Sequence, residues 1–110
     1  MNNELKGILG LCRRAGKICL GHDASDTSIK QRKAFLAITC TDTSDRLKKE
    51  IADECGFDSR KTKFLVAEFT MQDLGLAIGK KAGVFTITDE SFAKRLYTIL
   101  TGGHEYDKKI

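Results

Sequence analysis

Short apolar runs alternate with segments of helical periodicity along most of this 110-residue chain. Leu5, Ile8 and Leu9 recur at helical spacing, whereas residues 34–40 form one nearly continuous apolar run. The first pattern is typical of an amphipathic helix and the second of a strand buried on both faces. Because such elements alternate with short connections, we expect a sheet covered by helices on both faces. The predicted architecture is a three-layer α/β/α sandwich with a central four-stranded mixed sheet.

The element boundaries follow from caps and glycines. Gly16 is expected to stop the first helix, and Asp23 to cap the second, with Ala24 and Ile29 as its buried residues. The predicted outward face of this second helix consists of Asp23, Asp26, Thr27 and Lys30. The first two helices are expected over 2–15 and 23–32. Three further helices are expected: one from the capping residues 41–44 to Gly56, one from the capping box Thr70–Asp73 to 78, and one from Asp89 to Gly102. Strands are expected over 17–20, 34–40, 64–67 and 83–88. The prediction is one domain over 1–103 followed by a polar tail, 104–110.

Composition narrows the class of protein further. Apolar residues make up 41% of the chain, which is enough for one modest core and argues against intrinsic disorder. No apolar run reaches the ~18 residues that span a bilayer, and the start of the chain lacks the pattern of a signal peptide. We therefore expect a cytoplasmic protein that does not engage a membrane, and we expect it to be a monomer.

The cysteines and histidines are too sparse for a recognisable metal site or catalytic set. The four cysteines are spaced without a C-x-x-C pair, and His22 and His104 are the only histidines. We expect reduced, structural thiols. A His22–Asp23 pair beside a cysteine is conceivable as a nucleophile with its base, but no cysteine lies in a nucleophile motif. The sequence thus predicts a non-enzyme that needs no cofactor, no metal and no small-molecule substrate.

The charge is distributed unevenly, although the net value is only +4. Residues 1–33 and 80–110 are both net basic, whereas the middle of the chain is slightly acidic. Such asymmetry is weak evidence for an anionic partner such as nucleic acid, and on charge alone an ordinary solvated surface is the favoured explanation.

Two glycine turns combine with lysines in a way that suits phosphate. The Gly21–His22–Asp23 turn opens a helix, where free N–H groups and the positive end of the helix dipole attract anions. The basic loop of residues 79–83 precedes the last strand, although no Walker or dinucleotide-binding motif is present. In a three-layer sandwich both turns can reach the same edge of the sheet. With Lys17 and Lys30 beside them, they would form one shallow, open surface of a size that suits RNA.

Four features of the sequence are shared with a known superfamily: the segment 9–17 (LGLCRRAGK), Gly21 at the start of a helix, and the segments 74–79 (LGLAIG) and 89–94 (DESFAK). On these features, and in register over about residues 3–100, the chain resembles a superfamily of ribosomal proteins that bind kink-turn RNA. The superfamily includes the archaeal large-subunit protein "seven-Ae", its eukaryotic relative "thirty-e" and Gadd-like proteins, and the chain is most similar to bacterial YlxQ-type members. The resemblance implies a small α/β/α protein that recognises a bent RNA duplex with sheared G·A pairs, mostly by its shape.

The same resemblance implies the site. The start of the second helix would enter the RNA groove, the loop before the last strand would cover an extruded base, and flanking lysines would contact phosphates. Where the family often has Asn, Glu and Lys after the glycine, this chain has Asp23, Ala24 and Thr27. Lys30, one turn later, is the candidate substitute for the missing lysine. The expected RNA-binding residues are Lys17, Gly21, His22, Asp23, Ala24, Thr27, Lys30, Lys80, Lys81, Ala82, Gly83 and Val84.

Three functional interpretations remain open at this point. The first is an RNA-binding protein of the translation machinery or the ribosome, recognising a kink-turn-like RNA, with ribosomal RNA as one candidate. The second is a divergent member that has lost base-specific contacts and binds structured RNA through charge alone. The third is a protein-interaction module that has kept only the fold, because function depends on the site and not on the fold.

Overall fold

Five helices and four strands alternate in the computed structural model, which describes residues 1–57 and 62–104. The elements are α1 Asn3–Arg14, β1 Ile18–Leu20, α2 His22–Lys30, β2 Leu36–Thr39, α3 Asp45–Phe57, β3 Lys63–Val66, α4 Met71–Ile78, β4 Val84–Ile87 and α5 Glu90–Leu100. Their order is the predicted one. The predicted tail, 104–110, lies outside the described residues apart from His104.

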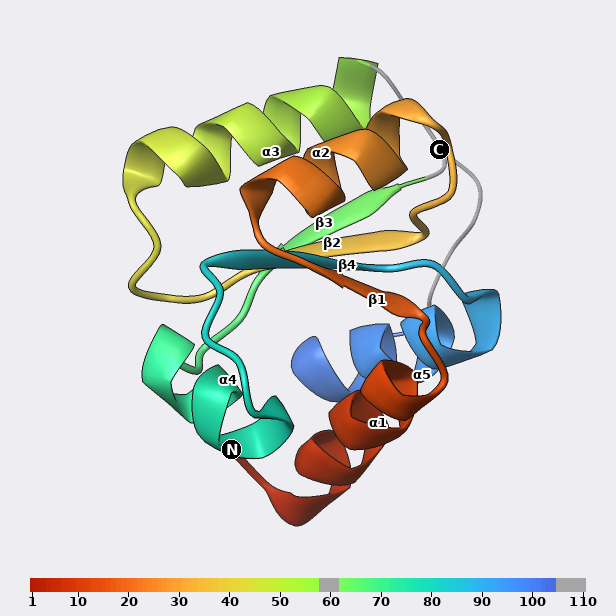
Figure 1. The fold of residues 1–110 in the computed structure, drawn as a ribbon, viewed down its shortest axis with the longest axis vertical. Helices are drawn as coiled ribbons and strands as arrows, with labels where there is room; N and C mark the ends of the chain where they lie inside the picture. Colours follow the sequence, from red (N-terminus) through yellow and green to blue (C-terminus); the bar gives the residue numbers. More distant parts are fainter. Residues whose placement is uncertain (58–61, 105–110) are drawn as a thin grey trace.

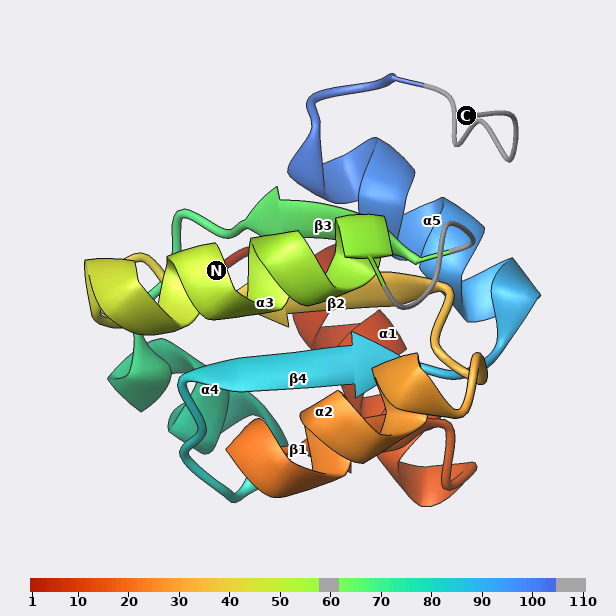
Figure 2. The ribbon, with the colours of Figure 1, turned by 90° about the horizontal axis from the view of Figure 1, so that it is seen from above.

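The strands form one mixed sheet in the order β1-β4-β2-β3. Strand β4 runs antiparallel to both of its neighbours, β1 and β2, whereas β2 and β3 are parallel. Helices α2 and α3 cover one face of this sheet, and α1, α4 and α5 cover the other (Figure 1). Seen from above, α2 and α3 lie side by side over the strands (Figure 2). The predicted three-layer α/β/α sandwich is therefore confirmed.

The central strands supply the core on both faces. Leu36, Ile38 and Phe85 pack with α1, α4 and α5, whereas Ala37 and Val84 pack with α2 and α3. Every residue of β2 and β4 is buried, which is why these strands have no polar alternation. No helix in the described parts of the chain has the length and apolar character needed to cross a membrane.

Local capping signals account for most helix ends. Gly16 adopts a positive φ directly after α1, and Thr70 and Asp73 form the predicted capping box at the start of α4. Two predicted ends are wrong. Gly56 lies inside α3 and does not end it. Gly21, and not Asp23, is the N-cap of α2, because its φ of 93° turns the chain two residues before the acidic side chain that was expected to cap the helix.

Helix α2 docks on the sheet through hydroxyl groups. Ser25 and Ser28 are buried, and the Ser28 hydroxyl shares a hydrogen bond of 2.7 Å with the hydroxyl of Thr86 on β4. Ser28 also donates to the Ser25 carbonyl oxygen. Ile29 is buried as predicted, but Ala24 is exposed. The prediction that Ala24 is buried is wrong because Ser25 and Ser28 fill the contact between α2 and the sheet, where Ser28 bonds the hydroxyl of Thr86.

Removing the Ser28 hydroxyl should destabilise the fold measurably. We expect Ser28→Ala to lower the free energy of unfolding by about 1–2 kcal/mol, because the buried Thr86 hydroxyl loses its partner. In Ser28→Ala/Thr86→Val both polar groups are absent, and most of that loss should be recovered. Urea unfolding of the wild type, both single variants and the double variant measures the coupling. Simple additivity of the two single effects would contradict the inferred bond.

Candidate nucleic-acid interface

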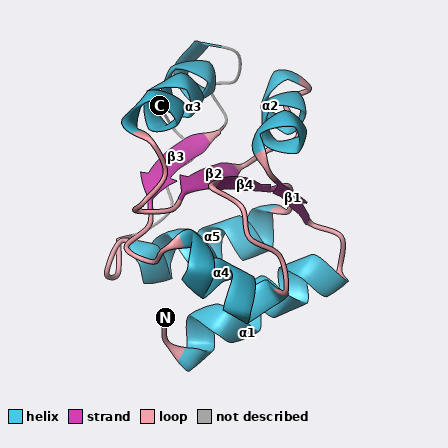
Figure 3. Ribbon diagram, turned by 60° about the vertical axis from the view of Figure 1, so that its left-hand side comes forward, coloured by secondary structure: helices cyan, strands magenta, loops and turns pink. Residues whose placement is uncertain are grey.

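The two glycine turns meet at one edge of the sheet. Because β1 and β4 are antiparallel, Leu20 at the end of β1 pairs with Phe85 near the start of β4. The N–H of Gly21 donates to the carbonyl oxygen of Val84 at 2.9 Å. The α4–β4 connection reaches the sheet at this point, beside the start of α2 (Figure 3). The expectation that both turns share one edge is confirmed.

An open groove of about 550 Å³ runs along the side of α2 that faces away from α3. Asp23, Ala24 and Thr27, the three positions at which the family pattern is altered, all line it. The groove is completed by Ser28, Gln31 and Lys33 from α2 and its end, and by Cys19 and Thr88 from the sheet side. The helix spacing explains this arrangement, since residues four apart lie on one face. No side chain caps the first turn of α2, so an anion can approach its N–H groups.

Lys17 stands at the opposite end of the groove from Gly21. Its carbonyl oxygen accepts the N–H of Thr88 at 2.9 Å, at the far end of β4. The four residue-to-residue steps from Lys17 to Gly21 cover about 13 Å of extended strand. Lys33, exposed beyond the end of α2, lines this same far end. Lys17 therefore flanks the groove where α2 ends, and not the turn where α2 begins.

The basic loop presents its two lysines over α4. Lys80 and Lys81 line a second hollow with Gly75 and the 78%-exposed Leu76. A Cβ atom on Gly75 would lie 2.8 Å from Cγ of Lys81, so the glycine makes room for the lysine stem. Both lysines are exposed, and among the described residues no ion pair neutralises either of them.

The end of the same loop is structural. Ala82 is 9% exposed and Val84 is 1% exposed, and their side chains lie in the cores on opposite faces of the sheet. The carbonyl oxygen of Gly83 accepts the Thr43 hydroxyl at 2.6 Å and the Cys40 N–H at 3.0 Å. The expectation that Ala82 and Val84 present apolar side chains to a base has to be corrected, because tertiary packing has already covered them.

His22 and Lys30 face α3 and not the groove. His22 Nε2 lies 3.7 Å from Glu50 on α3, and Lys30 Nζ lies 3.0 Å from Asp26. A hydrogen bond with the Glu54 side chain and the nearby Lys30 ammonium hold the pKa of Asp26 below its usual range. The prediction that Asp26 lies on the outward face of α2 is therefore wrong. Lys30, which is paired with Asp26, does not replace the charge that Thr27 lacks.

The cysteines do not form a reactive centre. All four are free thiols, and burial raises the pKa of Cys12, Cys40 and Cys55 to about 12. A thiol with such a pKa is protonated near neutral pH and is a poor nucleophile. Within residues 1–57 and 62–104, no three His, Cys, Asp or Glu side chains gather in a way that could hold a metal ion.

Sequence reasoning missed part of the groove. Gln31 and Lys33 were not singled out, although Gln31 continues the spacing of Asp23 and Thr27 by one more turn. This periodicity was available in the sequence. The contributions of Cys19 and Thr88 were not, since only the pairing of β1 with β4 brings these two residues to the same groove.

Comparisons with known proteins agree with this architecture. No protein-family model matches the sequence. RNA-binding protein YlxQ of Enterococcus faecium is 30% identical over 95 residues, which is 86% of this chain and 89% of that protein. RNA-binding protein YlxQ of Bacillus subtilis (strain 168) is 32% identical over 94 residues, covering 84% and 91%. A Bacillus halodurans protein of unknown function has a solved structure that superposes with a TM-score of 0.82 at 27% identity, covering 91% of this chain and 99% of that one.

The fold and the groove define a small three-layer α/β/α binding protein with an open, basic-flanked surface along its second helix. With two relatives at about 30% identity over most of both lengths, the chain belongs to the YlxQ family.

Proposed function

We propose that this protein is a non-catalytic RNA-binding protein of the translation machinery, which recognises a kink-turn or similarly bent RNA through the α2 groove. The observation that carries the proposal is the convergence of Asp23, Ala24 and Thr27 in one open groove that starts at the Gly21 turn. These are the positions that the family resemblance assigns to RNA contact. The names of the two YlxQ relatives, both described as RNA-binding proteins, support the partner class.

The groove favours recognition by shape over dense contacts to base edges. Ala24 offers no hydrogen bond from its side chain, and the Asp23 carboxylate accepts hydrogen bonds but does not donate any. The N–H groups at the start of α2 and the lysines Lys17 and Lys33 at its far end remain for phosphates, as in proteins that read the shape of structured RNA. We therefore expect the protein to bind kink-turn RNA more tightly than a matched plain duplex, by a modest factor.

A binding titration tests the proposal directly. The protein is titrated into a labelled kink-turn RNA and into a matched duplex without the sheared G·A pairs, in the presence of magnesium and at about 50 and about 200 mM salt. We expect at least fivefold tighter binding to the kink-turn at both salt concentrations. Equal binding to both RNAs would favour the second interpretation, a general binder of structured RNA. Absence of binding to either RNA would overturn RNA binding and leave the protein-interaction module.

The lysine contacts make a separate prediction. In Lys17→Ala/Lys80→Ala/Lys81→Ala, the salt dependence of kink-turn binding should flatten by about 2–3 units of log K per log salt, since each phosphate contact contributes about 0.7–0.9. The control variant, Arg46→Ala/Lys49→Ala/Lys94→Ala, removes the same charge from α3 and α5 and should keep most of the wild-type slope. Identical slopes in the two variants would contradict placement of the phosphates beside these three lysines.

A further inference from the structure

The cations of α1 differ from those of α2 and α3 in whether a carboxylate lies beside them. On α2 and α3, Lys30 and Lys49 each lie 3.0 Å from a carboxylate oxygen, and Arg46 lies 3.4 Å from one. On α1, no ion pair within 4 Å joins Lys6, Arg13 or Arg14 to a carboxylate of the described residues. The positive charge of α1 is therefore available to a partner, whereas that of α3 is largely neutralised within the fold.

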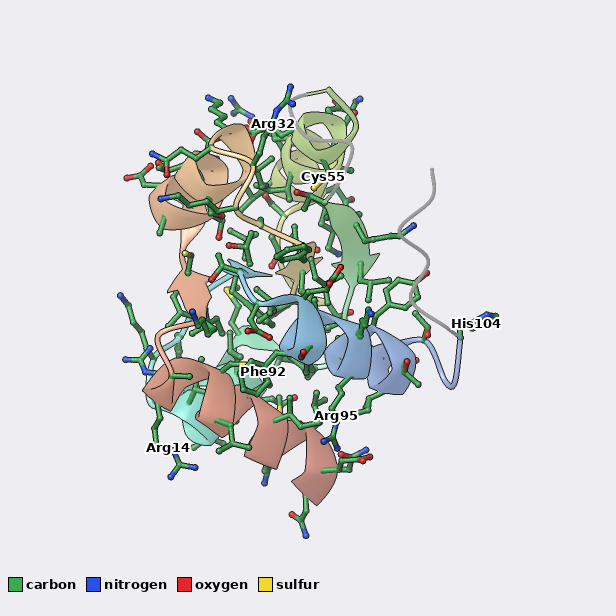
Figure 4. The ribbon with its side chains drawn as sticks, turned by 90° about the vertical axis from the view of Figure 1, so that its right-hand side faces the viewer. Arg14, Arg32, Cys55, Phe92, Arg95 and His104 are labelled. Atoms are coloured by element: carbon green, nitrogen blue, oxygen red, sulfur yellow. The ribbon has the colours of Figure 1, made fainter. Side chains whose placement is uncertain are left out.

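These three cations line a groove between α1 and α4. The groove measures about 410 Å³, and its remaining walls are Gly7, Gly10, Ala77 and Ile78. Lys6, Gly10 and Arg13 lie on one face of α1, at spacings of four and three residues. The side chain of Arg14 points away from the body of the protein at the end of the same helix (Figure 4). From Lys6 to Arg14 the charged strip extends over about 12 Å of helix.

Nearby carboxylates do not cancel this charge. Asp73 on α4 is close enough for Lys6 to contribute to lowering its pKa, but the main cause is the hydrogen bond from the Thr70 backbone N–H. Both partners of that capping box are engaged at the start of α4. Glu4, also on α1, lies 3.8 Å from Arg95 of α5, at the other end of the helix from Arg14.

Two glycines leave the backbone of α1 open inside this strip. A glycine within a helix is unfavourable compared with alanine, so it needs a reason. Packing within the chain does not supply one, because a Cβ atom on Gly7 or Gly10 would meet nothing within 4 Å. The absence of side chains at these positions lets a partner's backbone approach the helix closely, between the cations.

We propose that the α1–α4 groove is a second phosphate-binding surface, which takes the sugar–phosphate backbone of RNA. The partner is polyanionic because the strip is basic, and a forked guanidinium pairs well with phosphate. An acidic protein fits less well: stable protein interfaces have a centre of large apolar side chains, whereas the described residues that line this groove offer only two apolar side chains, the buried Ile78 and the half-buried Ala77. The surface lies on the opposite side of the sheet from the α2 groove, and Lys80 and Lys81 lie on the loop that leads from α4 to β4.

A plain RNA duplex of about 16 base pairs, without sheared G·A pairs, is the probe for this surface. The wild type is compared with Arg13→Ala/Arg14→Ala and with Arg46→Ala/Lys49→Ala, which removes the same charge from ion-paired positions on α3. Loss of two duplex phosphate contacts should reduce the salt slope by about 1.8, so that the wild type loses about tenfold more affinity than the α1 variant between about 50 and about 200 mM salt. The α3 variant should keep the wild-type slope.

Gly10→Ala separates binding from folding. Alanine is the better helix former, so we expect a higher Tm together with at least fivefold weaker duplex binding, because the added methyl group obstructs close approach. A merely structural role of Gly10 would leave the affinity unchanged. The proposed surface is overturned if Arg13→Ala/Arg14→Ala keeps the salt slope of the wild type, or if Gly10→Ala binds the duplex with unchanged affinity. Both experiments are independent of the kink-turn titration, since the duplex probe lacks the feature on which that titration depends.

Discussion

Substituting Asn, Glu and Lys at positions 23, 24 and 27 should raise the preference for kink-turn RNA over plain duplex by about tenfold or more. All three side chains line the α2 groove, so the changes act at one surface. Asp23→Asn adds an amide donor, Ala24→Glu adds an acceptor for base amino groups, and Thr27→Lys adds a phosphate-pairing charge. One good base contact contributes about 1–3 kcal/mol of discrimination, and 1.4 kcal/mol corresponds to tenfold. Competition binding with the two RNAs measures the ratio.

A charge-matched control makes this result specific. The triple change raises the net charge by one, and so does Asp45→Asn at a fully exposed position of α3. The control should strengthen binding to both RNAs slightly and leave their ratio unchanged. If the triple variant also leaves the ratio unchanged, the start of α2 does not contact the sheared pairs, and the proposed orientation of the RNA has to be abandoned.

Gly21→Ala should destabilise the protein by about 1–3 kcal/mol, which lowers the Tm by roughly 4–8 °C per kcal/mol in a domain of this size. The cause is the backbone and not crowding. Gly21 has φ 93° and ψ 169°, a region that only glycine occupies comfortably, although a Cβ atom there would meet nothing within 4 Å. Relief of the strain would disturb the N–H bond from Gly21 to Val84, which joins the two turns.

The same substitution elsewhere provides the control. Gly7 lies within α1, where an added Cβ atom also meets nothing, so Gly7→Ala should leave stability unchanged or raise it. Thermal unfolding of both variants distinguishes strain at one turn from a general effect of the added methyl group. Equal Tm values for Gly21→Ala and the wild type would mean that the turn relaxes without cost, which would contradict its role in holding α2 against β4.

Most of the fold was predictable because its signals are local. The continuous apolar run at 34–40 identified the buried strand β2, and the capping box at Thr70 and Asp73 marked the start of α4. The expectation that residues 64–67 form another buried strand is wrong, because β3 lies at the edge of the sheet and is only partly covered. The four-stranded sheet between two helical layers follows from the alternation of these elements. Local signals failed for α2, where Ala24 was expected to be buried and is exposed. The contact of α2 with the sheet is made by hydroxyl-bearing side chains, which apolar spacing does not identify.

The candidate site was predictable only in part, because some of its features depend on contacts between distant segments. Two glycine turns at one sheet edge follow from antiparallel pairing, and the bond between Gly21 and Val84 confirms that the turns meet. The ion pair of Lys30 with Asp26 follows from their spacing of four residues, and Lys6, Arg13 and Arg14 have no carboxylate three or four residues away. The side of the molecule on which a cation lies does not follow from spacing, because Asp26 meets Glu54 and Lys17 reaches Thr88 only through the packing of distant segments.

The sequence by itself determined the order and type of the elements, their principal caps and the turns at which they reverse. These features depend on contacts within a few residues along the chain, and backbone propensity and apolar spacing act over that range. Only the tertiary structure decided on which side of the molecule each charge lies and which loop side chains are buried. It buried Val84, tied His22 and Lys30 to the α3 side and left Lys17 at the far end of the groove, because strand pairing and layer packing bring distant segments together.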